Sequence, residues 1–232
     1  MVLFQQPFLM DFSSINRGLQ PTYSFDFTSD PSELNQDATN ISVDHTTNFR
    51  WDFDIKNDST NDASSIDLGS NLSNTAWICD FDLTYTTLTP VSGTTTSFFV
   101  LSDLSSATDS QTNQDALGFR VNFGVSDSIS NIESDGTTLP GGASDAFSTL
   151  TTVTTTTYYV RMIRESATSF KNTFYSDSDR TSETDSVTST IASSIQNLDH
   201  FKIANYSGGG GGSDTIIGYI KNLKIWDGIS SF

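Results

Sequence analysis

Apolar and polar residues alternate along most of the chain with a period of two. Within residues 48–56, Phe49, Trp51, Phe53 and Ile55 fall on one side of an extended segment, and charged residues fall on the other. Such alternation indicates a β-strand with one buried face. The same pattern recurs in residues 22–27, 117–123, 157–165, 169–176, 200–205 and 218–228. The sequence therefore predicts an all-β protein.

Clusters of turn-forming residues separate the predicted strands, at 57–62, 92–96, 134–142, 176–185 and in the glycine run 208–212. No segment between them predicts a helix longer than a turn or two. The short link SAT between residues 157–165 and 169–176 predicts an antiparallel hairpin. About 20 residues follow the glycine run, too few for a domain, so we interpret the run as a loop between two strands of one sheet.

The predicted strands form one domain over residues 22–232, because no linker separates two independent cores. Residues 1–21 are expected to be an N-terminal extension or edge segment. Residues 2–10 are too apolar for a free tail, and we predict that they pack along a sheet edge or against a neighbouring subunit.

The last predicted strand contains a break in its alternation. Leu223 and Ile225 share a face, but Ile220 is offset from them by an odd number of residues. A β-bulge near Lys221 would return all three side chains to the core. Trp226 then points away from the core, towards the rim or a neighbouring loop.

The composition sets further limits. The hydrophobic fraction is 35%, below the usual range of about 45–50%, but the chain has 17 Phe, 7 Tyr and 3 Trp. Large apolar residues diluted by Ser and Thr favour half-buried strands over disorder. The net charge of −17 argues against nucleic acid and anionic lipid as partners. A cation or a glycan remains compatible, and solubility alone is the other explanation for the charge.

The single cysteine, Cys79, excludes an intramolecular disulfide. It shares a face with Trp77, Phe81, Leu83 and Tyr85, which predicts a buried, unreactive thiol. The N-terminus lacks the positive region and cleavage site of a signal peptide. No apolar run reaches the roughly 20 residues of a membrane span, so we expect no membrane insertion.

Several segments resemble one known superfamily. DASSIDLG (62–69), TAWICDFDLTYT, the hairpin containing YYVRMIR and FKNTFYSDSD, and the closing LDHFKIANYSGGGGGSDTIIGYIKNLKIWDG resemble concanavalin A-like, laminin-G-like jelly rolls. The resemblance covers about residues 22–228 and implies a single jelly-roll β-sandwich of two antiparallel sheets. The family's paired acids in the last strand are replaced by Lys221 and Asn222, so it implies no calcium site there. The superfamily includes lectins, hydrolases, adhesion domains and virion proteins, so it leaves the activity open.

The sequence argues against an enzyme. Laminarinase-type hydrolases of this superfamily place their acids in an E-x-D-x-x-E motif, and the closest segment, ETDSVT, has Glu183 and Asp185 but Thr at the last position. His45 and His200 lie in no zinc spacing, and no G-x-S-x-G elbow or phosphate loop occurs. We therefore predict no catalytic residues.

A metal site is possible at one predicted hairpin tip. Asp177, Asp179, Glu183 and Asp185 lie within nine residues, and carboxylate oxygens suit Ca²⁺, the one cofactor that we consider. The segment does not fit the EF-hand pattern, and a solvated hairpin tip is the competing interpretation. Residues 57–67 are a second, weaker candidate.

Glycan binding would need aromatic platforms beside polar groups. Trp226, Tyr206 and Tyr159 lie off the predicted core faces or in loops, so they are the candidate ligand-binding residues; they could instead cover sheet edges. Our leading hypothesis is a non-catalytic structural or binding module of a virion or cell surface, which assembles with itself or with neighbouring structural subunits. A free glycan-binding, lectin-like module is the alternative, and a laminarinase-type hydrolase comes third.

Overall fold

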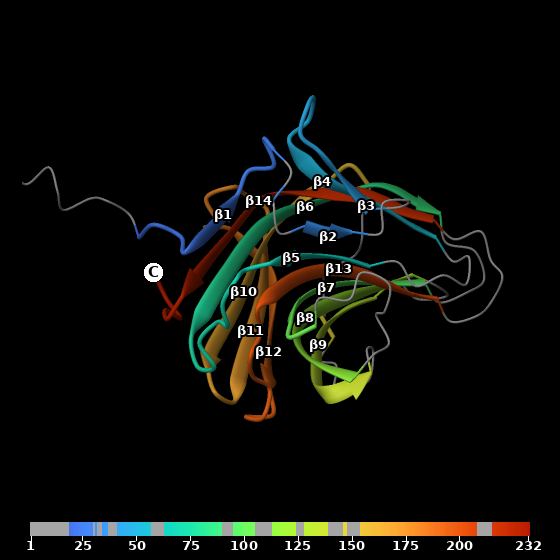
Figure 1. The fold of residues 1–232 in the computed structure, drawn as a ribbon. Helices are drawn as coiled ribbons and strands as arrows, with labels where there is room; N and C mark the ends of the chain where they lie inside the picture. The colour runs from blue at the N-terminus through green and yellow to red at the C-terminus, as the bar shows by residue number, and fades with distance from the viewer. Residues whose placement is uncertain are drawn as a thin grey trace, which may run out of the picture.

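Two antiparallel sheets packed face to face form the protein (Figure 1). The computed structural model describes residues 19–29, 31, 34–36, 41–56, 63–89, 95–104, 113–123, 128–138, 146–147, 154–207 and 215–232. Strands and turns account for these residues, and no helix occurs among them. In this part of the chain, therefore, no helix is long and apolar enough to cross a membrane. The predicted all-β sandwich is confirmed.

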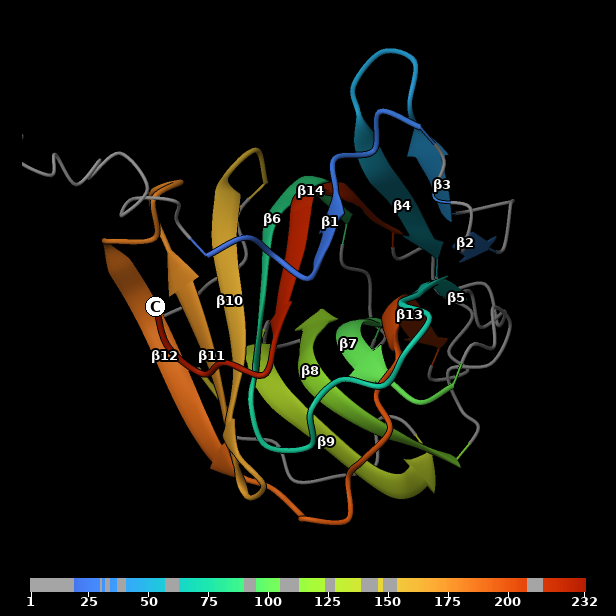
Figure 2. The same ribbon diagram turned by 60° about the vertical axis from the view of Figure 1, so that its left-hand side comes forward.

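The larger sheet has eight strands, in the order β12–β11–β10–β6–β14–β4–β3, with β1 paired to β14 (Figure 2). Its strands are β1 (Tyr23–Phe25), β3 (Ile41–Asp44), β4 (Arg50–Lys56), β6 (Trp77–Thr89), β10 (Thr157–Ser166), β11 (Ser169–Tyr175), β12 (Glu183–Thr190) and β14 (Thr215–Asp227). The smaller sheet has the order β2–β5–β13–β7–β8–β9. Its strands are β2 (Leu34–Gln36), β5 (Ala63–Asp67), β7 (Thr95–Ser102), β8 (Asn113–Phe123), β9 (Ser128–Thr138) and β13 (His200–Ser207).

Aromatic rings fill the space between the sheets. The rings of Phe81, Phe99 and Phe119 stack, with centroids 5.2 Å apart for Phe99 and Phe119. The predicted inward face of β6 is confirmed, because its alternating residues from Trp77 to Tyr85 are fully buried. Burial of these large rings provides most of the hydrophobic stabilisation of the sandwich.

The predicted bulge in β14 is also confirmed. The register between β14 and β6 shifts between Lys221 and Lys224, and Asn222 has a φ of 54°. Asparagine tolerates this left-handed conformation better than most residues do. Ile220, Leu223 and Ile225 are all fully buried as a result, and Trp226 lies on the opposite face.

The antiparallel hairpin predicted from the SAT link forms between β10 and β11. Arg164, which is fully buried, donates hydrogen bonds from Nε and Nη2 to the carbonyl oxygens of Ser166 and Ala167. These bonds hold the tight turn from the core side.

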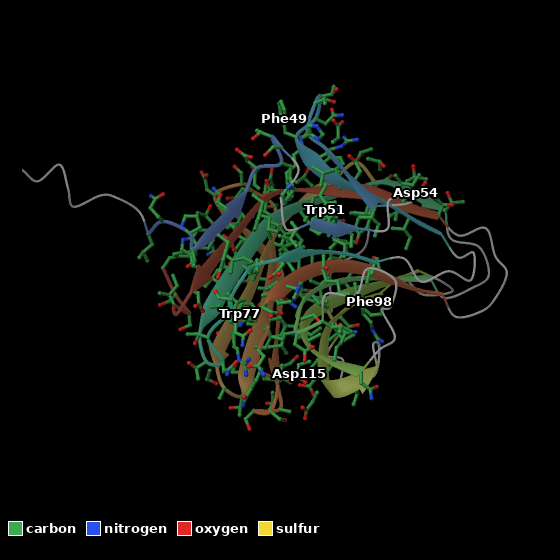
Figure 3. All side chains as sticks on the ribbon, viewed as in Figure 1. Phe49, Trp51, Asp54, Trp77, Phe98 and Asp115 are labelled. Atoms are coloured by element: carbon green, nitrogen blue, oxygen red, sulfur yellow. The ribbon has the colours of Figure 1, made fainter. Side chains whose placement is uncertain are left out.

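Phe49 corrects one sequence prediction. It was expected to point inwards with Trp51 and Phe53, but it is 46% exposed and precedes β4, which begins at Arg50 (Figure 3). The turn before it explains the difference, because the Asp44 carboxylate accepts hydrogen bonds within this turn and Phe49 follows in a left-handed conformation. The side chain of Ile55 lies outside the described residues.

Three expected turns also differ from the structure. The glycine run lies outside the described residues, but the strands on either side of it, β13 and β14, belong to different sheets. The connection between them therefore joins the two sheets, contrary to the prediction of one sheet. Residues 95–96 belong to β7 and residues 134–138 to β9, so strands replace the predicted turns there. The predicted packing of residues 2–10 falls outside the described residues.

Candidate functional site

The outward-facing side chains of the two sheets differ in exposure. On the six-stranded sheet, the outward-facing Phe98, Val100, Lys202 and Ala204 are fully buried. The outward face of the eight-stranded sheet, which we call the outer face, instead presents polar and aromatic side chains that reach solvent. A surface site on a sheet is therefore best sought on the outer face.

The outer face carries two of the three predicted ligand-binding aromatics. Tyr159 lies on β10, in register with Asp82 of β6, and Trp226 lies on β14, in register with Ile78 of β6. Tyr206 lies on β13 of the other sheet, and its side chain is outside the described residues. The structure therefore places Tyr159 and Trp226 on the same face of one sheet, and Tyr206 on a strand of the other sheet.

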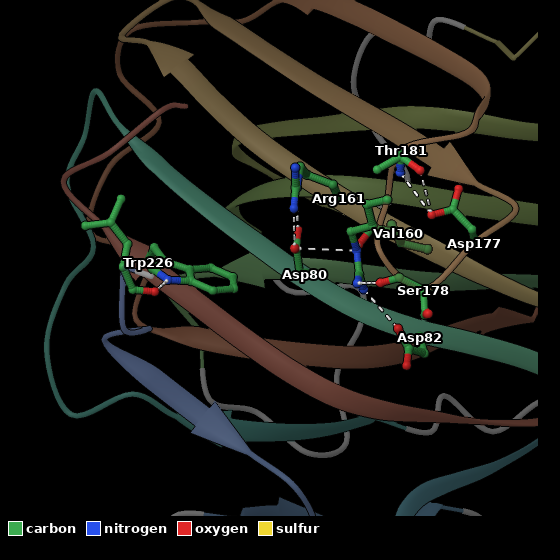
Figure 4. Close-up of polar contacts among 10 residues, drawn as sticks. Asp80, Asp82, Val160, Arg161, Asp177, Ser178, Thr181 and Trp226 are labelled. Atoms are coloured by element: carbon green, nitrogen blue, oxygen red, sulfur yellow. Dashed lines mark hydrogen bonds and ion pairs between the residues drawn. The ribbon is translucent and has the colours of Figure 1, made fainter. Parts of the chain in front are cut away.

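Two arginines and two aspartates form a continuous ion-pair network beside Tyr159 (Figure 4). Arg161 binds Asp80 through two bonds, Nε to Oδ1 at 2.8 Å and Nη2 to Oδ2 at 2.7 Å. Arg180 contacts Asp80 at 3.4 Å and Asp82 at 2.9 Å. Two-point contacts between arginine and carboxylate fix both side chains in one orientation.

The β11–β12 hairpin tip places Arg180 in this network. Asp177 accepts hydrogen bonds from the backbone amides of Thr181 and Ser182 with its two carboxylate oxygens, which holds the tip in a compact turn. Arg180 has a φ of 55° there, and its Nε donates to the carbonyl oxygen of Val160. The tip is therefore shaped so that Arg180 points back onto the sheet.

The β14 bulge contributes the last member of the network. Asn222 donates a hydrogen bond from Nδ2 to Asp82 Oδ2 at 2.6 Å. The residue that replaces an acid of the family pattern thus binds an aspartate of the neighbouring strand, and no calcium-type acid pair is present at Lys221 and Asn222.

Aromatic rings cover the other end of the outer face. The Phe232 ring packs edge-on against Trp226, with centroids 4.9 Å apart, and lies 4.6 Å from the Arg161 guanidinium. Trp226 Nε1 also donates a hydrogen bond to the carbonyl oxygen of Leu19. Leu19 and Phe232 are 60% and 59% exposed, so this end combines cationic and apolar surface.

Three of the four acids predicted to bind calcium have other contacts. Asp177 uses both oxygens in its turn, Glu183 accepts from the Ser186 hydroxyl, and Asp185 accepts from the Ser186 amide. The described residues, which include Asp179, contain no group of three or more His, Cys, Asp or Glu side chains placed to hold a metal. Asp177 thus serves to hold the hairpin tip, and calcium binding by this segment stays a prediction.

Asp80 and Asp82 share one face of β6, a spacing that could suggest a pair of catalytic carboxyls. A retaining glycosidase needs one carboxyl as nucleophile and one as proton donor. Here each carboxylate accepts hydrogen bonds from a guanidinium group, and Asp82 also accepts one from Asn222. The two carboxylates are thus placed to hold Arg161 and Arg180 in fixed positions.

The ion-pair network was not predicted from the sequence. The alternation in CDFDLT placed Asp80 and Asp82 outside the core, which was the one signal available. Arg180 is 98 residues from Asp82, and its approach depends on a hairpin turn that alternation does not describe.

No family model and no curated protein sequence matches the chain. Its structure is similar to a legume lectin-like domain from Entamoeba histolytica, with 10% identity over 90% of this chain and 99% of that one and a TM-score of 0.52. The metal-free Emp46p carbohydrate recognition domain is 12% identical over 91% of this chain and 100% of that one, with a TM-score of 0.51. The Crh5 transglycosylase in complex with NAG is 15% identical over 90% of this chain and 85% of that one, with a TM-score of 0.54.

These likenesses establish the fold. The chain shares the β-sandwich fold of these structures, which agrees with the jelly-roll architecture that the sequence resemblance implied. Because the similar structures include both recognition domains and an enzyme, the fold leaves the activity to be argued from the outer face.

Proposed function

We propose that the protein is a non-catalytic β-sandwich module that binds a glycan through its outer face. The carrying observation is that a half-buried ring, Tyr159, and an exposed ring, Phe232, lie beside polar groups that are held in fixed positions. Tyr159 and Phe232 offer ring surfaces, and Arg161 and Arg180 are oriented by their ion pairs. Rings stack on the apolar faces of sugars, and fixed polar groups select hydroxyl positions.

The comparisons support a recognition module without deciding the ligand. Two of the similar structures are described as a lectin-like domain and a carbohydrate recognition domain. The ionic contacts of Asp80 and Asp82 support a module without catalysis, because both carboxylates bind arginine side chains.

An oligosaccharide array followed by titration calorimetry tests this proposal. Tyr159→Ala and Phe232→Ala should each weaken binding about tenfold, as expected for truncation of a ring in a binding site. Phe49→Ala is the matched control, because Phe49 is an exposed ring in the β3–β4 turn. Bound oligosaccharides should remain uncleaved on long incubation. Failure of every glycan to bind, or full affinity in both variants, would reject the proposal.

A structural role in assembly is the second candidate. Leu19 and Phe232 are two of the three large hydrophobic side chains exposed in the described residues. The Phe232 ring packs against Trp226, and the Leu19 carbonyl oxygen accepts a hydrogen bond from it. Aromatic side chains are enriched at protein interfaces, so this end of the outer face could bind a neighbouring subunit on a virion or cell surface.

Light scattering across a concentration series tests self-assembly. A dimer or larger species should dissociate in the variant Leu19→Ser/Phe232→Ser and persist in Phe49→Ser. A wild-type protein that remains monomeric throughout argues against self-assembly. Antibody labelling of intact particles and cells tests the surface location.

A further inference from the structure

Basic side chains are concentrated on the outer face. The sequence has 11 Lys and Arg against 28 Asp and Glu. Nine basic side chains lie within the described part of the chain, and six of them are on the outer face, on strands β4, β10, β11 and β14 or at the β11–β12 tip: Arg50, Arg161, Lys171, Arg180, Lys221 and Lys224. The outer face is therefore richer in basic side chains than the rest of this protein, whose net charge is −17.

The arginines and the lysines of the face differ in how their charges are compensated. Arg50 pairs with Asp52 at 2.8 Å, and Arg161 and Arg180 pair with Asp80 and Asp82. These arginines are therefore largely neutralised by their partners, and they take up three of the face's carboxylates.

The three lysines have no such partner. Within the described residues, Lys171, Lys221 and Lys224 form no ion pair, and Lys221 lies 5.4 Å from the Tyr219 ring. Glu165, a further acid of β10, accepts a hydrogen bond from Ser169 at the β10–β11 turn. Lys221 also acts by its charge on Asp52, so the described basic side chains of the face with no acidic partner are Lys171 and Lys224.

Two of these lysines flank the aromatic end of the face. Lys224 is in register with Asp80, the partner of Arg161. Lys171 lies in the same row across the sheet as Trp226, because the row runs from Lys171 through Ile163 and Ile78 to Trp226. Lys171 and Lys224 lie on β11 and β14, three strand spacings apart, or about 14 Å. The rings of Trp226 and Phe232 lie in this region, so a chain of two or three sugar units could contact rings and both lysines.

We infer that the ligand of the outer face is an anionic oligosaccharide, whose carboxylate or sulfate groups bind Lys171 and Lys224 while its rings stack on the aromatic end. This inference rests on the proposed glycan binding and names its ligand class. The overall negative charge of the protein repels anions, so an anionic ligand would bind where lysines are concentrated. Because salt screens this attraction, binding would weaken as the salt concentration rises.

Calorimetric titrations with three hexasaccharides test the inference: a uronate, a sulfated glycan and a neutral glucan. The uronate or the sulfated hexamer should bind at least about tenfold more tightly than the neutral one, as expected for two charge-assisted contacts. Preference between the two acidic probes identifies carboxylate or sulfate as the recognised group. Raising the salt concentration should weaken acidic binding and leave neutral binding unchanged.

The double variant Lys171→Gln/Lys224→Gln should lose most of the acidic preference and keep its melting temperature. The control Thr154→Asp/Ser193→Asp changes the net charge by the same amount at exposed turns away from the face and should keep that preference. Equal, salt-independent binding of neutral and acidic probes would overturn the anionic class and leave the proposed glycan binding intact. Binding of no saccharide at all would overturn both.

Discussion

Arg161 and Asp80 face each other across β10 and β6 and are joined by two hydrogen bonds of 2.8 and 2.7 Å. Burial by itself would lower the pKa of the Arg161 guanidinium, but the bonds to Asp80 outweigh it, and the pKa is raised. The Asp80 side chain is 6% exposed and also contacts Arg180. The pair therefore links two strands and a hairpin tip through one carboxylate.

Removal of that carboxylate should be costly. Asp80→Ala leaves two guanidinium groups without their acceptor, and we expect the free energy of unfolding to fall by about 3–5 kcal/mol. Urea denaturation measures the loss. The control Asp52→Ala removes a pair that is 28% exposed on both sides, and it should cost less than about 1 kcal/mol. Equal losses in the two variants would contradict a special role for the network.

Asp177 should behave as a turn residue in acid. Hydrogen bonds from the Thr181 amide, and then from Ser182, hold the pKa of Asp177 down to about 2 from its ordinary 3.8. A carboxyl with a lowered folded pKa stabilises the fold fully above about pH 4, and this contribution is lost as the pH falls towards 2. NMR titration of the carboxyl carbon measures the pKa, and Asp177→Ala should flatten this part of the stability profile.

Calcium provides the contrasting outcome for the same residue. Because both oxygens of Asp177 are engaged in the turn, millimolar calcium or a chelator should leave the melting temperature unchanged. A calcium-dependent rise that disappears in Asp177→Asn would restore the metal hypothesis.

Gly118 should tolerate no side chain. A Cβ at this position would lie 2.1 Å from the carbonyl oxygen of Phe99 and 2.7 Å from the Cα of Val100, both on the paired strand β7. Because backbone atoms cannot move aside cheaply, Gly118→Ala should destabilise the protein by about 3 kcal/mol or more. Gly136→Ala is the control, since nothing lies within 4 Å of its Cβ and the cost is the left-handed φ of 56°, about 1–2 kcal/mol. Thermal denaturation compares the two.

Residues 22–232 should unfold as one cooperative unit. Burial raises the pKa of the Cys79 thiol well above its usual value, so the folded protein should resist thiol reagents at neutral pH. Labelling of Cys79 in increasing urea should then follow the loss of circular dichroism with the same midpoint. Two separated midpoints would instead indicate more than one domain.

Alternation predicted the strands in which one face is buried and the other is open. It failed at β7, where Phe98, Phe99 and Val100 are buried in succession because both faces of this strand are covered. A strand buried on both sides has no polar positions to mark its period. Its first residues, Thr95 and Thr96, belong to the segment SGTTT, whose composition is typical of a turn.

The site could be predicted in part for a related reason. Tyr159 and Trp226 were found because they interrupt or oppose the core pattern of their own strands. Arg161 and Asp80 acquire their role from pairing across strands, at a separation of 81 residues, and a single strand pattern contains no information on its partner. Pairing order and turn geometry thus account for the residues that were missed.

The position of β14 has a consequence for protein synthesis. This strand follows all the other described strands in the sequence, yet it lies in the middle of the larger sheet, between β6 and β4, and also pairs with β1. A growing chain therefore carries β4 and β6 with open edges until β14 leaves the ribosome, and such edges are prone to pair with other chains. A product truncated before Thr215 would lack this strand altogether, so incomplete chains should be candidates for chaperone binding and degradation.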